Sequence, residues 1–187
     1  MVRLIDNIPK KIVDDIELWV TGTKIPWFFF DHTLGQDQRG SYPVSQDTYT
    51  IADLPRLTHY FYPNSKTPQE DRKFIMPLTD WCRRYILPPN YEVRRVMGNL
   101  TTQLRDAELL LNIPHVDSDD GEKFTFLYYV NDSDGQTVFF EDGKIVYETS
   151  PVRGTGALFP SNTVHAGQVP CINKTRYVIN IIFSKRD

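Results

Sequence analysis

Two segments in the first half of the chain carry hydrophobic residues at the spacing of an amphipathic helix. In the first segment these residues recur every three or four positions: Ile12, Val13, Ile16, Trp19 and Val20. Pro9 suits the first turn of this helix. The second segment covers residues 74–86 and follows Thr67-Pro68-Gln69-Glu70, a helix start in which Thr67 can act as the cap. Pro77 predicts either a kink or a division into two shorter helices.

From residue 91 onward, hydrophobic positions alternate with a period of two, which is typical of strands. The pattern predicts strands at residues 91–97, 99–105, 123–130, 136–141, 144–148, 155–159, 163–169 and 175–184. Asp142-Gly143 predicts a tight hairpin turn between two of these strands. Two helices followed by many strands predict an α+β fold, mainly β, built as a β-barrel or jelly roll.

Between the two predicted helices lie three further segments. Residues 25–32 include four consecutive aromatic residues and suit an early strand or a lid, with packing as the main role of the rings. Residues 33–53 are polar and predict a long loop. Residues 54–62 include His59. Because His32 and His59 lack a second ligand at metal spacing, we expect both to be structural or exposed.

The composition indicates one globular domain with a sizeable core. The chain has 187 residues, of which 40% are hydrophobic and 24% charged, as in ordinary soluble proteins. Its net charge of −3 gives no general attraction to nucleic acid. The basic pairs Arg83-Arg84 and Arg94-Arg95 are therefore expected to be solvated or to form salt bridges.

Cysteine usage and hydropathy bear on the compartment. Cys82 and Cys171 are too few for a disulfide scaffold and stand in no paired metal-binding spacing, so we expect reduced thiols and a cytoplasmic protein. The sequence shows no signal-peptide pattern. No apolar run approaches the roughly 18 residues that a membrane helix needs.

The candidate chemistry centres on Ile113-Pro114-His115-Val116-Asp117. In an extended segment, side chains two positions apart point to the same face, so His115 and Asp117 can share a site. A second histidine, His165, would have to come from another strand. Two histidines and one carboxylate are the ligand set of a non-haem Fe(II) facial triad. Asp119-Asp120 is followed by Gly121 and is expected to be a solvated turn outside this metal site.

Arg176 opens the last predicted strand, ahead of a long apolar run. A lone arginine on a core strand needs an anion, because burying an unpaired charge is unfavourable. Its planar guanidinium matches a carboxylate in a bidentate pair. Arg176 is therefore a candidate for holding an anionic co-substrate.

The ordered set His115, Asp117, His165 and Arg176 resembles the Fe(II)/2-oxoglutarate-dependent dioxygenases, and most closely their prolyl-4-hydroxylase-like branch with its small bacterial and phage-type members. The resemblance spans about residues 99–183 and includes the segments 127–131, 135–139 and 154–159 in the family's order. It implies a double-stranded β-helix with N-terminal supporting helices. We expect one domain over residues 1–187, with helical support in residues 1–90 and a catalytic β core at about 91–187.

The same resemblance implies the cofactors and their ligands. Fe(II) would be bound by the histidines and the aspartate, 2-oxoglutarate would be the co-substrate, and O2 the oxidant. Arg176 and Tyr129 would contact the distal carboxylate of 2-oxoglutarate, Tyr129 being the second tyrosine of a Tyr-Tyr-hydrophobic-Asn segment. By alternation, Thr125, Leu127 and Tyr129 share one strand face. Three alternating residues on a neighbouring strand can also reach the co-substrate: Asn99, Thr101 and Gln103.

The implied activity is hydroxylation coupled to oxidative decarboxylation of 2-oxoglutarate to succinate. The substrate would be a prolyl or other peptidyl side chain, or a small molecule. A cupin-type metalloenzyme that does not use 2-oxoglutarate is an alternative, against which Arg176 and the scarcity of histidines argue. A non-catalytic binding module on the same fold is another, against which the intact triad argues. A nucleic-acid demethylase is disfavoured by the acidic balance.

Overall fold

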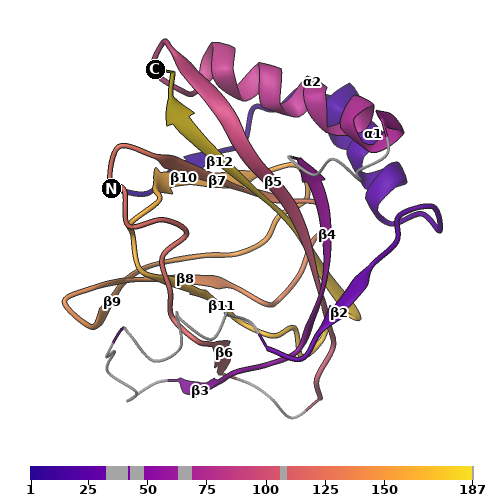
Figure 1. The fold of residues 1–187 in the computed structure, drawn as a ribbon. Helices are drawn as coiled ribbons and strands as arrows, with labels where there is room; N and C mark the ends of the chain where they lie inside the picture. The colour runs from indigo at the N-terminus through magenta and orange to yellow at the C-terminus, as the bar shows by residue number, and fades with distance from the viewer. Residues whose placement is uncertain (33–41, 43–48, 63–68, 106–108, 187) are drawn as a thin grey trace.

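The computed structural model describes residues 1–32, 42, 49–62, 69–105 and 109–186. Within these ranges the fold is mainly β with two helices, α1 (Lys10–Val20) and α2 (Gln69–Tyr85) (Figure 1). The strands are β1 (Arg3–Ile5), β2 (Phe28–Phe30), β3 (Thr50–Ala52), β4 (Arg56–Tyr62), β5 (Tyr91–Thr102), β6 (Leu110–Asn112), β7 (Phe124–Tyr129), β8 (Thr137–Glu141), β9 (Lys144–Thr149), β10 (Gly156–Pro160), β11 (His165–Gly167) and β12 (Thr175–Lys185).

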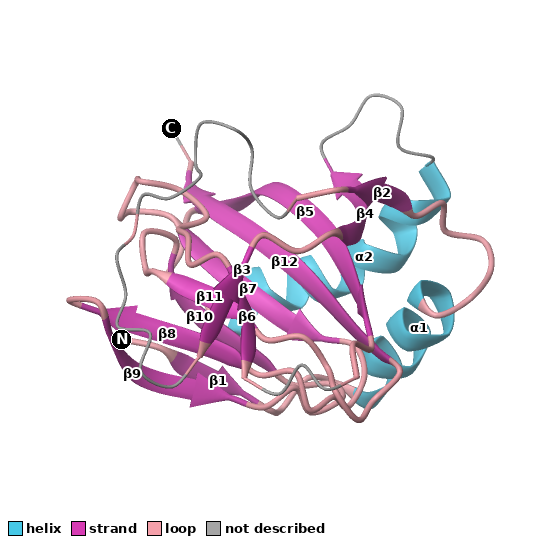
Figure 2. Ribbon diagram, turned by 90° about the horizontal axis from the view of Figure 1, so that it is seen from below, coloured by secondary structure: helices cyan, strands magenta, loops and turns pink. Residues whose placement is uncertain are grey.

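The strands form two main layers with the candidate site between them. In the described part of the chain, a seven-stranded antiparallel sheet has the order β1-β10-β7-β12-β5-β4-β2. A smaller sheet, β11-β8-β9, lies opposite the long strands, and β3 pairs with β6 in parallel (Figures 1 and 2). This arrangement is the double-stranded β-helix predicted from the sequence resemblance.

The outer face of the main sheet is the principal hydrophobic core. Both helices lie on this face, as Figure 2 shows. The core is built from apolar side chains of the sheet and of the helices, including Ile16, Leu78, Cys82, Val96, Phe126, Tyr128, Ile179, Ile181 and Phe183. α2 continues through Pro77 as a single helix, with Ile75 and Leu78 buried on either side of the proline, so the alternative of two shorter helices was wrong. The helix start at Thr67 lies outside the described residues.

Residues 91–102 form one long strand, β5, where the sequence predicted two. Gly98, taken as a break between strands, sits in the middle of β5 and pairs with Ile179 of β12. A Cβ on Gly98 would lie 3.0 Å from the Phe61 ring and 3.3 Å from the Trp27 ring. The glycine therefore makes room for two aromatic rings on the outer face rather than ending the strand.

The first 62 residues contribute strands as well as a helix. β1 extends one edge of the main sheet and β2 the other, so the early strand predicted in residues 25–32 is confirmed. The packing role predicted for its aromatic residues was wrong for Phe28 and Phe29, which are 57% and 68% exposed because β2 is an edge strand. Most of the loop predicted at residues 33–53 lies outside the described residues.

His59 is structural, as predicted. It is 3% exposed, its Nδ1 donates to the carbonyl oxygen of Pro26 (2.8 Å), and its Nε2 is 3.1 Å from a carboxylate oxygen of Asp71 on α2. His32 hydrogen-bonds to Asp31 near the surface. The hairpin predicted between β8 and β9 is also confirmed, with Asp142 at φ 50° and Gly143 at φ 74° in the turn. Neither described helix is long and apolar enough to span a bilayer.

Candidate functional site

The structure brings His115, Asp117 and His165 together although 48 residues separate the last two in sequence. One ligand atom from each residue lies within 4.8 Å of the others. A reciprocal pair of backbone hydrogen bonds joins His115 to His165, each 2.9 Å. The amide of Asp117 also donates to the carbonyl of Ser161 (2.9 Å), just ahead of β11. Backbone pairing between two distant segments therefore fixes the spacing of the three side chains.

Both imidazoles present the same nitrogen to the centre of this cluster. Nδ1–H of His115 donates to the carbonyl of Ile113, and Nδ1–H of His165 donates to the carbonyl of Thr163, each at 3.0 Å. These bonds leave Nε2 of each ring as the free lone-pair donor. Burial, together with the neighbouring His165, lowers the pKa of His115 to about 4, so this ring is neutral at physiological pH.

The carboxylate of Asp117 is held by three side chains from three strands. The Asn180 amide donates to both carboxylate oxygens (3.0 and 2.9 Å), and the Thr125 hydroxyl donates to Oδ2 (2.8 Å). Arg95 adds a longer contact from Nη2 to Oδ1 (3.3 Å). Burial alone would raise the pKa of Asp117, but the charges of His165, His115 and Arg95 and the hydrogen bond from Asn180 together keep it below its usual value.

These side chains fit an Fe(II) ion. Two imidazole nitrogens and one carboxylate oxygen converge from two backbone-paired segments, and Nε2 of His165 lies 3.8 Å from Oδ2 of Asp117. A ligand set of this chemistry on one side of a metal leaves other coordination positions free. The hydrogen bonds to Nδ1 and to the carboxylate are the supporting contacts that metal ligands ordinarily have.

Arg176 lies on the same inner face of β12 as Asn180, four residues away. It is 6% exposed, and its Nε donates to the Gly135 carbonyl (2.6 Å) and its Nη2 to the Thr137 hydroxyl (2.8 Å). Within the described ranges no carboxylate lies within 4.0 Å of this guanidinium. Burial lowers its pKa. Arg176 is therefore a buried cation whose described hydrogen-bond partners are neutral oxygens.

Tyr129 completes this group. It pairs with Val178 across β7 and β12, its hydroxyl donates to Thr137 Oγ1 (2.9 Å), and its ring lies 6.0 Å from the Arg176 guanidinium carbon. A Cβ on Gly135 would lie 2.9 Å from Cδ of Arg176, so the glycine makes room for the arginine side chain. Tyr129, Thr137 and Arg176 thus converge between the two sheets and place hydroxyl groups beside a buried cation.

Of the three residues expected to reach the co-substrate from β5, one is placed elsewhere. Gln103 lies beyond the end of β5, where its side-chain amide donates to the carbonyl of Cys171 (2.6 Å), so that prediction was wrong. The chain leaves the sheet after Thr102, which pairs with Thr175. Asn99 remains on the inner face and accepts a hydrogen bond from Thr58 (3.1 Å). Asp120 accepts a hydrogen bond from the backbone amide of Glu122 and pairs with Lys123, and it is not part of the His115–Asp117–His165 group.

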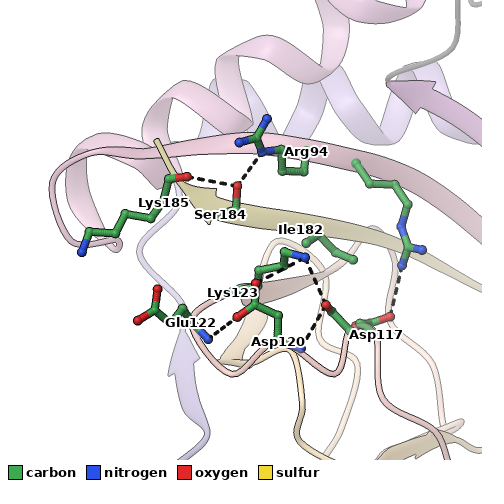
Figure 3. A pocket seen from close by; sticks show the side chains of 10 residues that line it. Arg94, Asp117, Asp120, Glu122, Lys123, Ile182, Ser184 and Lys185 are labelled. Atoms are coloured by element: carbon green, nitrogen blue, oxygen red, sulfur yellow. Dashed lines mark hydrogen bonds and ion pairs between the residues drawn. The ribbon is translucent and has the colours of Figure 1, made fainter. Parts of the chain in front are cut away.

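Sequence reasoning missed Asn180, Arg95 and Arg56 as parts of this site. A cleft of about 520 Å³ opens beside Asp117 and is bordered by β5, β12 and the segment before β7 (Figure 3). Its lining includes four cations, Arg94, Arg95, Lys123 and Lys185. Alternation along β5 places Arg95 on the same inner face of the sheet as Asn99, and this could have been predicted. Nothing in the sequence indicates that Arg95 reaches Asp117.

Comparison with known proteins agrees with this chemistry. The sequence model of the 2OG-Fe(II) oxygenase superfamily matches residues 112–184, which include His115, Asp117, His165 and Arg176. A search of curated proteins found none that matches the chain.

Solved structures share the fold at low sequence identity. A 2OG-Fe(II) oxygenase family oxidoreductase from Burkholderia pseudomallei is 10% identical with a TM-score of 0.65, covering 100% of this chain and 86% of that one. A Trichoplax adhaerens prolyl hydroxylase, in complex with a hypoxia inducible factor peptide, is 17% identical with a TM-score of 0.59, covering 98% and 83%. The α-ketoglutarate-dependent epimerase SnoN of nogalamycin biosynthesis is 9% identical with a TM-score of 0.62, covering 100% and 79%.

The matched segment, residues 112–184, spans the triad and identifies this part of the chain as the core of a 2OG-Fe(II) oxygenase superfamily enzyme. The superfamily and the triad imply Fe(II) as the metal and 2-oxoglutarate as the co-substrate. This match favours the oxygenase interpretation over the cupin-type and non-catalytic alternatives.

Proposed function

We propose that this protein is a 2-oxoglutarate-dependent hydroxylase of the prolyl-4-hydroxylase-like branch. One observation carries the proposal: the described inner face of the barrel joins the His115–Asp117–His165 cluster to a second group, Tyr129–Thr137–Arg176. The first group has the donor chemistry for Fe(II). The second supplies a buried cation and hydroxyl groups for the distal carboxylate of 2-oxoglutarate.

Each of these residues has a distinct task in the proposed reaction. Nε2 of each histidine and the Asp117 carboxylate would hold the metal, while Asn180 and Thr125 keep the carboxylate in position. Arg176 and Tyr129 would orient 2-oxoglutarate, and Phe139 and Phe159, both fully buried beside His165, exclude water from that side. When bound, Fe(II), 2-oxoglutarate and O2 supply the oxidation that yields succinate, carbon dioxide and the hydroxylated substrate.

The substrate in this proposal is a prolyl or other peptidyl side chain, or a small molecule. The likeness to a prolyl hydroxylase that binds a peptide supports a peptidyl substrate. The likeness to SnoN, an epimerase, bears on the reaction type, because one fold can serve several outcomes. The low cysteine count, with only Cys82 and Cys171 in the sequence, supports a reducing compartment such as the cytoplasm.

The test of this function is succinate formation in the presence of Fe(II), 2-oxoglutarate and O2, with a panel of proline-containing peptides and small molecules. We expect succinate, together with a mass increase of one oxygen atom in a substrate of the panel. An Asp117→Ala variant serves as the matched inactive protein. Absence of 2-oxoglutarate-dependent succinate from the iron-loaded wild type would refute the proposal.

A further inference from the structure

Two arginines on adjacent strands of the main sheet point toward the triad. Arg95 of β5 reaches Asp117, with Nη2 3.3 Å from Oδ1. Arg56 of β4 lies on the same inner face, because it alternates with Thr58, whose hydroxyl contacts Asn99 on the inner face of β5. Burial and, next, the charge of His165 lower the pKa of His115, and the charge of Arg56 lowers it further.

One nitrogen of each arginine has no acceptor among the described residues. Nε of Arg56 and Nε of Arg95 are both buried without a hydrogen-bond partner. In the described part of the chain, no carboxylate lies within 4.0 Å of Arg56. Arg95 pairs with Asp117 through Nη2, which leaves its Nε without an acceptor. Leaving buried donors unpaired is unfavourable, so such a pair is expected to have a ligand.

The two guanidinium groups also disfavour each other. Burial lowers the pKa of Arg56 most and the charge of Arg95 lowers it further, while Tyr60, Asp117 and Asp53 raise it. An anion placed between the two arginines would remove this repulsion and supply the missing acceptors. Carboxylate and phosphate oxygens are the acceptors that the guanidinium fork fits best.

The cleft beside Asp117 gives access to Arg95 and carries charges of both signs (Figure 3). Its lining includes Lys123 and Lys185 as well as the acidic residues Asp120 and Glu122, and Asp120 lies 3.4 Å from Lys123. Arg95 is 34% exposed, so solvent and ligands can reach it from this cleft.

We propose that Arg56 and Arg95 bind a carboxylate group of the prime substrate beside the metal centre. The inference rests on the proposed function, because it names the substrate class of the same site. In that function the two carboxylates of 2-oxoglutarate are held at the metal and at Arg176, so the Arg56–Arg95 pair is left for the substrate. The anion would fix which carbon of the substrate faces the metal.

The test measures binding without turnover. Protein loaded with Zn(II) and 2-oxoglutarate is titrated by calorimetry with two matched probe pairs. The first pair is the capped peptides Gly-Asp-Pro-Asp-Gly and Gly-Asn-Pro-Asn-Gly, and the second is N-acetyl-L-proline and N-acetyl-L-prolinamide. We expect the acidic member of at least one pair to bind about tenfold or more tightly than its neutral partner. A preference for the acidic member of the peptide pair indicates an acidic peptide as the substrate. A preference within the proline pair indicates a small-molecule acid.

Variants separate the arginine pair from general charge. Arg56→Gln and Arg95→Gln should each reduce the preference for the acidic probe to about twofold or less, while Arg56→Lys should keep part of it. Arg84→Gln, an exposed residue on α2, removes the same charge from the helical side and should keep the wild-type preference. Zn(II) binding and thermal unfolding of each variant show that the fold and the metal site persist.

Two results would overturn the anion site. One is equal binding of acidic and neutral probes in both pairs by the wild type. The other is a loss of 2-oxoglutarate binding in Arg56→Gln with an unchanged probe preference, which would assign the arginine to the co-substrate. If the iron-loaded wild type fails to form succinate, the proposed function is contradicted. The anion site is tested separately by the ratio of acidic-probe to neutral-probe affinity, because that measurement needs no turnover.

Discussion

The two faces of β5, β7 and β12 have opposite characters although they share the same backbone. On the outer face, Ile179 and Phe126 are fully buried against the helical layer. On the inner face, the next residues along, Asn180 and Thr125, hold the carboxylate of Asp117. Because side chains alternate along a strand, adjacent residues point to opposite faces, one into the hydrophobic core and the next toward the metal-ligand cluster. Substitutions on the two faces should therefore have separable effects.

The largest expected effect on chemistry is from His165→Ala. Removing one of three metal ligands should abolish 2-oxoglutarate-dependent succinate formation, because the metal loses a donor that no described neighbour can replace. Asn162→Ala, an exposed change three residues earlier, is the control and should stay active. Near wild-type succinate formation by His165→Ala would remove this residue from the triad.

Next in size is the effect of Arg176→Gln on the co-substrate. Losing the buried cation should raise the KM for 2-oxoglutarate by roughly 30-fold or more, as expected for one partner of a buried charged pair. Arg176→Lys keeps the charge without the planar guanidinium, so its KM for 2-oxoglutarate should lie between those of the wild type and Arg176→Gln. The stabilisation of the wild type against heat by 2-oxoglutarate should also be lost. An unchanged KM would show that Arg176 is not the anchor.

On the outer face, Ile179→Ala should affect stability and leave the co-substrate site intact. A cavity at this fully buried position should reduce the free energy of unfolding by about 2–5 kcal/mol. Ile172→Ala removes the same atoms from a side chain that is 81% exposed and should change it by less than about 0.5 kcal/mol. Denaturant unfolding and the KM for 2-oxoglutarate test this, and a raised KM in Ile179→Ala would contradict the separation of the two faces.

The smallest effect expected is on metal affinity in Asn180→Ala. Without the amide that donates to both oxygens of Asp117, Fe(II) affinity should fall about 10- to 100-fold, the range for residues that support a ligand. Unfolding stability without metal should change less than in Ile179→Ala. Anaerobic competition with a metal chelator measures the affinity. An unchanged affinity would mean that Thr125 and Arg95 suffice to hold the carboxylate.

The features that could be predicted from the sequence were those with a local signal. His115 and Asp117 stand two apart, and alternation alone places Thr125 and Tyr129 on one face. The alternation of hydrophobic positions with a period of two predicted most of the strands, and Asp142-Gly143 predicted the hairpin turn. Asn180, by contrast, belongs to an apolar run, and its contact with Asp117 depends on which strands become neighbours.

Other features depended on tertiary contacts that no local pattern reports. Gly98 was taken for a strand break, whereas the bulk of Phe61 and Trp27 explains why it is glycine. Arg56 and Arg95 lie on strands far apart in sequence, and only the pairing of β4 with β5 brings them to one face. Gln103 alternates with Asn99 and Thr101 in sequence, but it lies past Thr102, the last paired residue of β5, so its side chain is not held on the same face.

The most direct test of the central claim is an anaerobic titration of the metal-free protein with Fe(II) and then 2-oxoglutarate, followed in the visible spectrum. One equivalent of Fe(II) should bind, and 2-oxoglutarate should then produce the weak charge-transfer absorption of a chelated 2-oxo acid, in the wild type and not in His165→Ala. Fe(II) binding without this absorption would contradict the use of 2-oxoglutarate. No Fe(II) binding would contradict the metal centre itself.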